Sequence, residues 1–163
     1  MGPTTELRRA LKEQFFPYAT SRGFVMDNRR QPHVTTFRRR AANGVHIFDV
    51  QWEKYGRPRF AVHFGTCPAS GLVANGVTLA PEEALATWCA DRGSLRPRRS
   101  APAHAAFRQD ATFWQRVLGR PRLRNATEVV DELAAVFPEL ERYWISGELG
   151  RHLKLWQVAH ARD

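Results

Sequence analysis

Apolar residues in the first part of the chain recur at the spacing of an α-helix. They are Leu7, Leu11, Phe15 and Tyr18. Side chains three or four positions apart lie on one face of a helix, which has about 3.6 residues per turn. The pattern therefore predicts a helix over residues 5–22. Pro17 should kink this helix, and Gly23 should end it because glycine readily adopts the left-handed conformation.

Residues 24–66 change to the alternating pattern that is typical of β-strands. Runs rich in β-branched and aromatic residues are separated by turn signals at Asn43-Gly44 and Tyr55-Gly56. Asn-Gly is a strong hairpin signal because both central residues of a type I′ turn need a positive φ. After a short β-rich run at residues 24–26, the pattern predicts three strands in antiparallel meander order. Their expected ranges are 33–40, 45–53 and 59–65.

Two-residue turns at these two places imply a register for the meander. The first turn places Arg38 opposite Asp49, and the second places Phe48 opposite His63. Because side chains alternate between the faces of a strand, His63 should then lie on the opposite face from Asp49. One predicted face carries Phe37, Phe48, Val50, Trp52, Ala61 and His63. The other carries Thr36, Arg38, Ile47, Asp49, Gln51, Phe60, Val62 and Phe64. Both faces contain apolar residues, so helices or loops should cover much of each.

The second half of the chain predicts mainly helices. Pro81-Glu82-Glu83 is a typical helix start, since proline fits the first turn and carboxylates interact favourably with the N-terminal dipole. Asp110 and Asn125 are candidate N-caps. The expected helices cover residues 81–91, 112–118 and 148–160, and a longer helical stretch begins at Asn125, with Pro138 separating two abutting helices. Residues 68–78 and 94–106 are expected to be loops, apart from an edge strand at 95–98.

These elements predict an α+β fold: an antiparallel sheet of about four to five strands, with an N-terminal helix and several C-terminal helices packed on it. A length of 163 residues is typical of one domain. We therefore expect a single domain over residues 1–163. It would comprise a basic helix-plus-sheet portion, 1–124, and a C-terminal helical portion, 125–163.

The net positive charge of the chain indicates anionic partners. The net charge is +9, and 22 of the 25 basic residues are arginine. Residues 1–124 carry 21 basic and nine acidic side chains, whereas residues 125–163 carry four and seven. A basic protein is attracted to nucleic acid and acidic proteins, although an arginine-rich composition can also reflect genome base composition. No apolar run approaches the ~20 residues that span a bilayer, and the N-terminus lacks a secretory signal, so we expect a cytoplasmic protein without membrane contact.

Motifs of the common enzyme classes do not occur in the sequence. It lacks a phosphate-binding Gly-rich loop, a Gly-x-Ser-x-Gly nucleophile turn and a His-Glu-x-x-His zinc motif. Its two cysteines and six histidines have no metal-ligand spacing. We therefore expect no cofactor and no metal, and a non-catalytic protein is favoured over an enzyme.

Arg38, Asp49 and Gln51 form the most distinctive polar group of the predicted sheet. An Asp and a Gln within an aliphatic strand must be hydrogen-bonded or exposed, since an unpaired buried charge is costly. A structural ion pair between Arg38 and Asp49 beneath a loop is one interpretation. The other is the polar floor of a cleft, in which Arg38 binds a carboxylate or phosphate.

Arginine runs are a second candidate feature. They occur at residues 29–30, 38–40, 57–59, 96–99 and 120–124, with aromatic residues nearby that could stack on bases. No known nucleic-acid-binding motif accompanies them. Most such runs are solvated surface, and nucleic-acid binding is the alternative.

At Asp49-Val50-Gln51-Trp52 and Phe60–Gly65 the chain resembles an uncharacterised bacterial family, domain of unknown function 4304. Phe37-x-Arg39 and Gln51 fit the family pattern, whereas His63 stands where the family usually has Asn, and Trp52 also departs. The resemblance covers about residues 7–145 and extends to the Arg-containing strand near Leu95 and to Phe113-Trp114. It implies an α+β fold and no assigned activity. It marks four positions as candidate site residues: Gln51, His63, Arg96 and Arg98.

Three functions are therefore considered. The first is a non-catalytic protein-interaction module of the immunity or regulatory type, whose partner is another protein. The second is a protein that binds nucleic acid or another polyanion through its arginines. The third is an enzyme with a polar site on the sheet near Asp49. The candidate binding residues are Arg38, Asp49, Gln51, His63, Arg96 and Arg98, in that order along the chain, and no catalytic residue is assigned.

Overall fold

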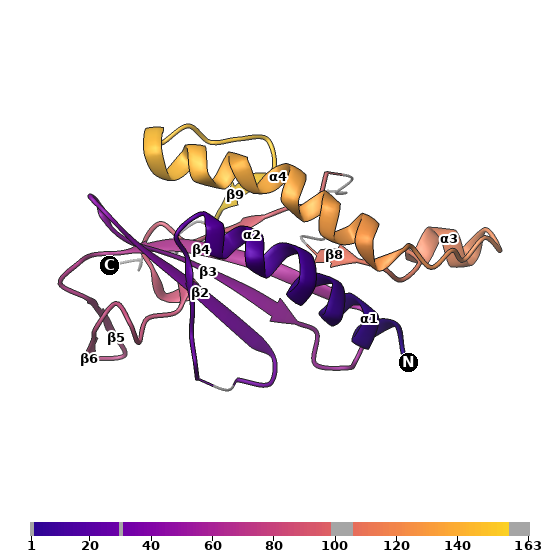
Figure 1. Cartoon of the computed structure of the whole chain (residues 1–163), viewed down its shortest axis with the longest axis horizontal. Coiled ribbons are helices and arrows are strands. Elements are labelled where there is room, and N and C mark those ends of the chain that lie inside the picture. Colours follow the sequence, from indigo (N-terminus) through magenta and orange to yellow (C-terminus); the bar gives the residue numbers. More distant parts are fainter. Residues whose placement is uncertain (1, 30, 99–105, 157–163) are drawn as a thin grey trace, which may run out of the picture.

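The computed structural model describes residues 2–29, 31–98 and 106–156 of the chain. It has an α+β fold with an antiparallel sheet, as the sequence predicts (Figure 1). The sheet has seven strands, more than the four to five expected, in the order β1-β2-β3-β4-β7-β9, with β8 also paired to β4. The strands are β1 Val25–Met26, β2 Val34–Ala41, β3 Gly44–Trp52, β4 Arg59–Cys67, β7 Gly93–Leu95, β8 Ala106–Arg108 and β9 Leu153–Leu155.

The N-terminal helix covers the predicted range in three consecutive parts. These are α1 (Pro3–Ala10), η1 (Leu11–Phe15) and α2 (Phe16–Ser21). Where a kink at Pro17 was expected, the helix has a π-helical turn, η1, just before the proline. A π-helical turn absorbs a local misfit in the hydrogen-bond ladder while the helix continues. Gly23 ends the helix with φ of +87°, as predicted.

The hairpin between β2 and β3 differs from the predicted register by two positions. Ala41 pairs with Gly44, so Asp49 lies opposite Thr36, and Arg38 lies opposite Ile47. The turn residues are therefore Ala42-Asn43. Gly44 is instead the first residue of β3. It lies so close to β4 that a Cβ at this position would be 2.4 Å from the carbonyl oxygen of Cys67, so only glycine fits. A shift of two positions keeps each side chain on its predicted face, so the predicted faces of β2 and β3 are correct although the pairing of Arg38 with Asp49 is wrong.

The predicted pairing of β3 with β4 is wrong by one position, which reverses every side chain of β4. Asp49 pairs with His63, and Phe48 pairs with Phe64. His63 therefore lies on the Asp49 face, contrary to the prediction. The physical reason is burial: this register places three large apolar side chains in the main core and the smaller or polar Ala61 and His63 on the other face. Those three side chains, Phe60, Val62 and Phe64, are at most 1% exposed.

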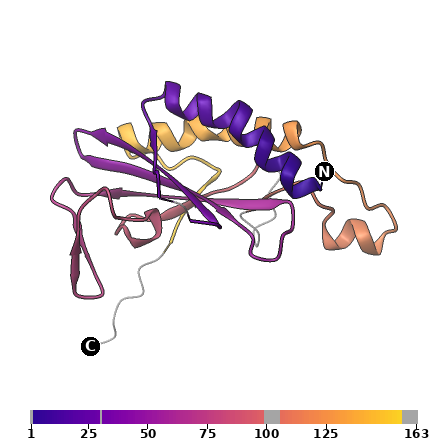
Figure 2. The ribbon, with the colours of Figure 1, turned by 60° about the horizontal axis from the view of Figure 1, so that its bottom comes forward.

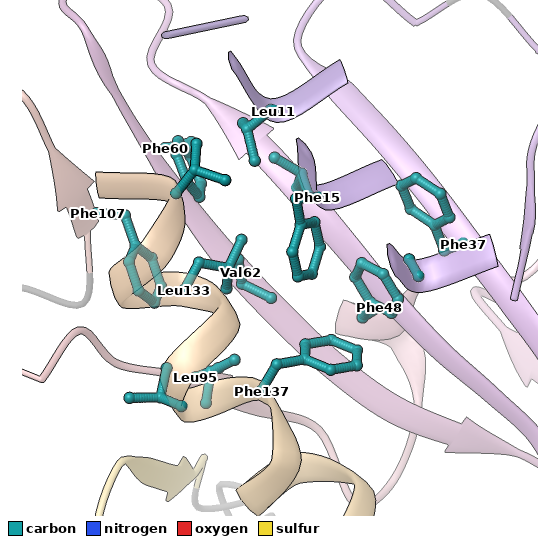
Figure 3. Packing of buried hydrophobic residues seen from close by; sticks show 14 of the residues in the cluster. Leu11, Phe15, Phe37, Phe48, Phe60, Val62, Leu95, Phe107, Leu133 and Phe137 are labelled. Carbon is teal, nitrogen blue, oxygen red and sulfur yellow. The ribbon is translucent and has the colours of Figure 1, made fainter. Parts of the chain in front are cut away.

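The main core lies between the sheet and two helices. The N-terminal helix and α4 (Ala126–Ser146) cover the same face of the sheet (Figures 1 and 2). Phe15, Phe48 and Phe137 meet there edge to face, with ring centroids 5.1 to 6.1 Å apart (Figure 3). On the second face of the sheet a smaller cluster is covered by the segment 80–92. Its buried members are Val45, Ile47, Cys67, Ala84, Ala86 and Cys89.

Four predictions for the second half of the chain are wrong. Residues 126–146 form one helix that continues through Pro138, not two. Residues 81–91 form turns and the short 3₁₀-helix η2 (Ala86–Trp88). Residues 68–78 are not a loop throughout, since β5 (Leu72–Ala74) and β6 (Val77–Leu79) form a hairpin. Within the predicted last helix the described residues contain β9, and positions 157–160 lie outside the described residues.

The remaining predictions are close to the structure. A strand, β7, does occur near the expected edge strand at 95–98, but it begins at Gly93, ends at Leu95 and is not at the edge, since it lies between β4 and β9. Helix α3 (Phe113–Val117) is capped by Thr112 rather than by Asp110, through a hydrogen bond from the Gln115 N–H. Asn125 caps α4 as predicted. No helix among the described residues is long and apolar enough to cross a membrane.

Candidate functional site

Asp49 is a buried carboxylate on the second face of the sheet. It is 2% exposed. Its Oδ1 accepts a hydrogen bond from the Thr36 hydroxyl at 2.7 Å, and its Oδ2 accepts one from the backbone N–H of Ala86 at 2.9 Å. Burial raises the pKa of Asp49 to about 6, although both hydrogen bonds act in the opposite direction. Asp49 therefore anchors the segment 80–92 to the sheet.

Arg38 anchors the same segment and makes no ion pair with Asp49. Its guanidinium donates to the carbonyl oxygens of Pro81 at 3.0 Å and Ala84 at 2.6 Å, and to Asp27 Oδ2 at 2.7 Å. Two carbonyl oxygens of this segment therefore accept from a side chain of the sheet, which competes with the hydrogen-bond ladder of a helix. The predicted ion pair between Arg38 and Asp49 is therefore wrong, because each side chain binds other partners.

His63 and Ser94 continue the row that begins at Asp49 on neighbouring strands. Asp49 pairs with His63, and His63 pairs with Ser94. Burial lowers the pKa of His63, and its Nδ1 is buried without a hydrogen-bond partner among the described residues. The ring of Trp156 packs edge-on against His63 with centroids 4.9 Å apart, and its Nε1–H donates to Ser94 Oγ at 2.8 Å.

This Asp–His–Ser row lacks the connections of a catalytic triad. A triad needs a carboxylate that holds the imidazole and an imidazole that accepts the serine proton. Both oxygens of Asp49 are occupied by other donors, and Ser94 is 4% exposed beneath Trp156. A substrate carbonyl cannot reach the hydroxyl of Ser94 in this arrangement. The row therefore stabilises the second face and is not a site for acyl transfer.

Gln51, Arg96 and Arg98 do not join Asp49 in one site. Gln51 pairs with Ala61 and lines a hollow of about 380 Å³ beside Tyr55, at the turn between β3 and β4. The guanidinium of Arg96 donates to the Arg151 carbonyl, and Arg98 is exposed beyond the end of β7. Of the six candidate residues, the structure places Arg38, Asp49, Gln51 and His63 on the same face. Only Arg38 and Asp49 bind a common segment.

Many arginines are engaged in ion pairs within the protein. Arg38 and Arg29 share Asp27, and Arg22 and Arg39 share the buried Glu141. The other pairs within hydrogen-bonding distance are Arg40–Glu82, Arg59–Glu53, Arg108–Asp110 and Arg124–Glu132. These arginines neutralise the protein's own carboxylates, so runs such as 38–40 do not form a free cationic surface.

A metal site is not formed within residues 2–29, 31–98 and 106–156. No group of three or more His, Cys, Asp or Glu side chains comes together there. Cys67 and Cys89 are both buried, and burial raises the pKa of Cys89 to about 12, so its thiol stays protonated. A protonated thiol is a poor metal ligand and a poor nucleophile.

An exposed apolar helix is the feature that sequence reasoning missed. Every residue from 112 to 123 is exposed, and this segment, here called the α3 arm, projects to one side of the sheet (Figures 1 and 2). Its helix carries Phe113, Trp114 and Val117, and Leu118 is the C-cap. These four side chains are 57% to 71% exposed. The signal in the sequence was four apolar residues at helical spacing in a segment, 112–123, that carries three basic residues and no acidic one.

The base of the α3 arm is fixed although the arm itself is exposed. The N–H of Arg124 donates to the carbonyl oxygen of Gln109 at 2.8 Å, which closes the segment into a loop. Arg108 binds Asp110 at one end of the loop, and Arg124 binds Glu132 of α4 at the other. The arm is therefore presented from a well-defined position on the protein.

Comparison of the chain with protein-family models, curated proteins and solved structures finds no significant match.

Proposed function

We propose that this protein is a non-catalytic module that binds another protein and docks through the α3 arm. The observation that carries the proposal is the exposure of four large apolar side chains on one short helix. Phe113 and Trp114 also contact each other edge to face, with ring centroids 5.7 Å apart, so they form one continuous surface. Single exposed apolar residues are ordinary, whereas a contiguous patch marks an interaction site.

The composition of the arm also fits a protein interface. Aromatic residues and arginine are enriched at the centre of protein–protein interfaces, and lysine and acidic residues are depleted. The arm contains Phe113, Trp114 and three arginines, with no lysine and no acidic residue. Burying the apolar side chains of the arm would contribute about 1.5 to 3 kcal/mol each before the cost of association is subtracted.

The other two functions have weaker support. A polyanion-binding surface needs free cations, and the ion pairs described above occupy many of the arginines. An enzyme needs a reachable polar site, and Asp49 is covered. The resemblance to domain of unknown function 4304 assigns no activity, so an immunity or regulatory role is the finer form of this proposal.

The arm can be tested by placing a photo-crosslinking amino acid at position 114 and, as a control, at Ile145, which is also exposed. In cells that produce the protein, we expect a crosslinked product at position 114 that is absent at position 145. The partner identified from the crosslinked product is then purified on its own. It is titrated with the wild-type chain and with the double variant Phe113→Ala/Trp114→Ala.

We expect the double variant to weaken binding by at least 100-fold without changing the melting temperature, because both side chains are exposed in the free protein. Ile145→Ala/Leu149→Ala is the matched control, since it removes two exposed apolar side chains elsewhere and should leave binding unchanged. The proposal fails if position 114 gives no specific product, or if the double variant binds as tightly as the control.

A further inference from the structure

We infer that the partner's docking site for the α3 arm is an apolar groove bordered by carboxylates. This inference rests on the proposed function and specifies the chemistry of the partner. It follows from the juxtaposition of an exposed apolar stripe with arginines that have no acidic neighbour in the arm.

The apolar side chains of α3 lie on one side of the helix. Successive residues of a helix are turned by about 100°, so Phe113, Trp114, Val117 and Leu118 fall within an arc of about 140°. Gln115 and Arg116 project from the remaining part of the circumference. A stripe of this shape is the face that an amphipathic helix lays into a groove. From Phe113 to Leu118 the helix rises by only about 8 Å, so the groove is short.

The charged residues of the arm set the expected rim of that groove. Arg116, Arg120 and Arg122 all lie within the exposed segment, which contains no Asp or Glu. Just before the arm, the carboxylate of Asp110 binds Arg108 at 3.0 Å and lies 3.9 Å from Arg116. Arg120 and Arg122 make no ion pair with the described residues. Carboxylates on the partner would therefore meet cations that are not already neutralised.

Three other occupants fit this surface less well. An anionic membrane is bound by longer amphipathic helices, because a helix of five residues inserts little apolar area. Nucleic acid stacks on aromatic rings but gains little from Val117 and Leu118. A second copy of this chain would bring the same arginines and another net charge of +9 to the contact. An acidic protein groove satisfies both the apolar and the charged parts of the arm.

The test uses the purified crosslinked partner and measures its dissociation constant at 50 and 500 mM salt. We expect Arg120→Glu/Arg122→Glu to weaken binding about tenfold at 50 mM and much less at 500 mM, mainly through a slower association rate. Arg142→Glu/Arg151→Glu is the control, because it changes the net charge equally at exposed positions outside the arm. It should alter the affinity less than twofold.

The outcomes separate this inference from the proposed function. If Phe113→Ala/Trp114→Ala abolishes binding but the two charge-reversal variants behave alike, the acidic rim is wrong and the docking arm stands. If the apolar variant has no effect, the docking arm itself is wrong. Defined probes test the other occupants: phosphatidylserine vesicles, a 20-base single-stranded DNA and sedimentation of the protein alone. Binding or self-association that depends on Trp114 in any of these assays would overturn the inference.

Discussion

Replacing Phe137 by alanine is expected to lower the free energy of unfolding by about 4 kcal/mol, the range found for buried aromatic side chains. Phe137 is fully buried on α4 and packs edge to face on Phe15 and Phe48, as well as on Tyr18 and Phe24. Its removal opens a cavity where the two helices and the sheet meet (Figure 3). Because small domains are stable by only about 5 to 15 kcal/mol, the loss is a large fraction of the total.

Urea unfolding monitored by circular dichroism measures this loss. Ile145→Ala on the same helix is the matched control, since Ile145 is 82% exposed and its truncation should change the free energy of unfolding by less than about 0.5 kcal/mol. Phe137→Leu fills part of the cavity and should fall between the two variants. Equal midpoints for Phe137→Ala and Ile145→Ala would show that α4 does not pack on the sheet in this way.

The three central strands were predictable because their alternating pattern is strong. The side-chain faces were predicted correctly for β2 and β3 but not for β4. The prediction placed a two-residue turn at Tyr55-Gly56, whereas the connection between β3 and β4 comprises residues 53–58. The length of a connection decides the strand register, and a glycine alone does not reveal that length. The apolar content of β4 indicated the correct register, since burying Phe60, Val62 and Phe64 is more favourable than burying Ala61 and His63.

The wrong helix at residues 81–91 has a different cause. Pro81-Glu82-Glu83 is a valid local start signal, but the backbone that follows is used by side chains distant in sequence. Arg38 takes two of its carbonyl oxygens, and Asp49 takes the N–H of Ala86. Local propensity cannot anticipate such tertiary hydrogen bonds.

The α3 arm shows a third limit. The sequence predicts its helix, yet an apolar stripe is normally assigned to the core. Only the arrangement of the neighbouring elements shows that nothing in the described chain covers Phe113 and Trp114. The candidate site was therefore present in the sequence as a helix but not recognisable as a surface.

The pH dependence of stability should identify Asp49 as a buried acid. Its pKa in the folded protein is about 6, against an ordinary value of 3.8. A pKa that is raised by folding stabilises the protein fully below pH 3.8, and this contribution is lost as the pH rises through 6. Two pKa units correspond to about 3 kcal/mol. Ionised Asp49 is therefore expected to lower the free energy of unfolding at pH 7.5.

His46 acts in the opposite direction over the same pH range. Burial, assisted by Arg39, lowers its pKa from 6.5 to about 4. A histidine whose pKa is lowered by folding contributes stability above pH 6.5, and that contribution is lost as the pH falls through 4. The contributions of Asp49 and His46 therefore partly compensate between pH 4 and 6.5, and the pH dependence of the wild-type protein alone does not isolate Asp49.

Asp49→Asn separates the two contributions. The asparagine amide can donate to the Thr36 hydroxyl oxygen while its carbonyl oxygen accepts from the Ala86 N–H, so both hydrogen bonds of Asp49 have an equivalent. We expect Asp49→Asn to match the wild type at pH 4 and to exceed it by about 2 to 3 kcal/mol at pH 7.5, measured by urea unfolding. Asp49→Ala removes the charge as well but leaves the Thr36 hydroxyl and the Ala86 N–H unpaired.

The alanine variant should therefore be about 2 kcal/mol less stable than Asp49→Asn at both pH values. A constant difference between these two variants isolates the hydrogen bonds, because neither variant carries a charge at position 49. A difference between Asp49→Asn and wild type that grows with pH isolates the cost of ionisation. If that difference is the same at pH 4 and pH 7.5, Asp49 is ionised throughout. The segment 80–92 would then admit water to the carboxylate, and the covered polar row would have to be reconsidered as an accessible site.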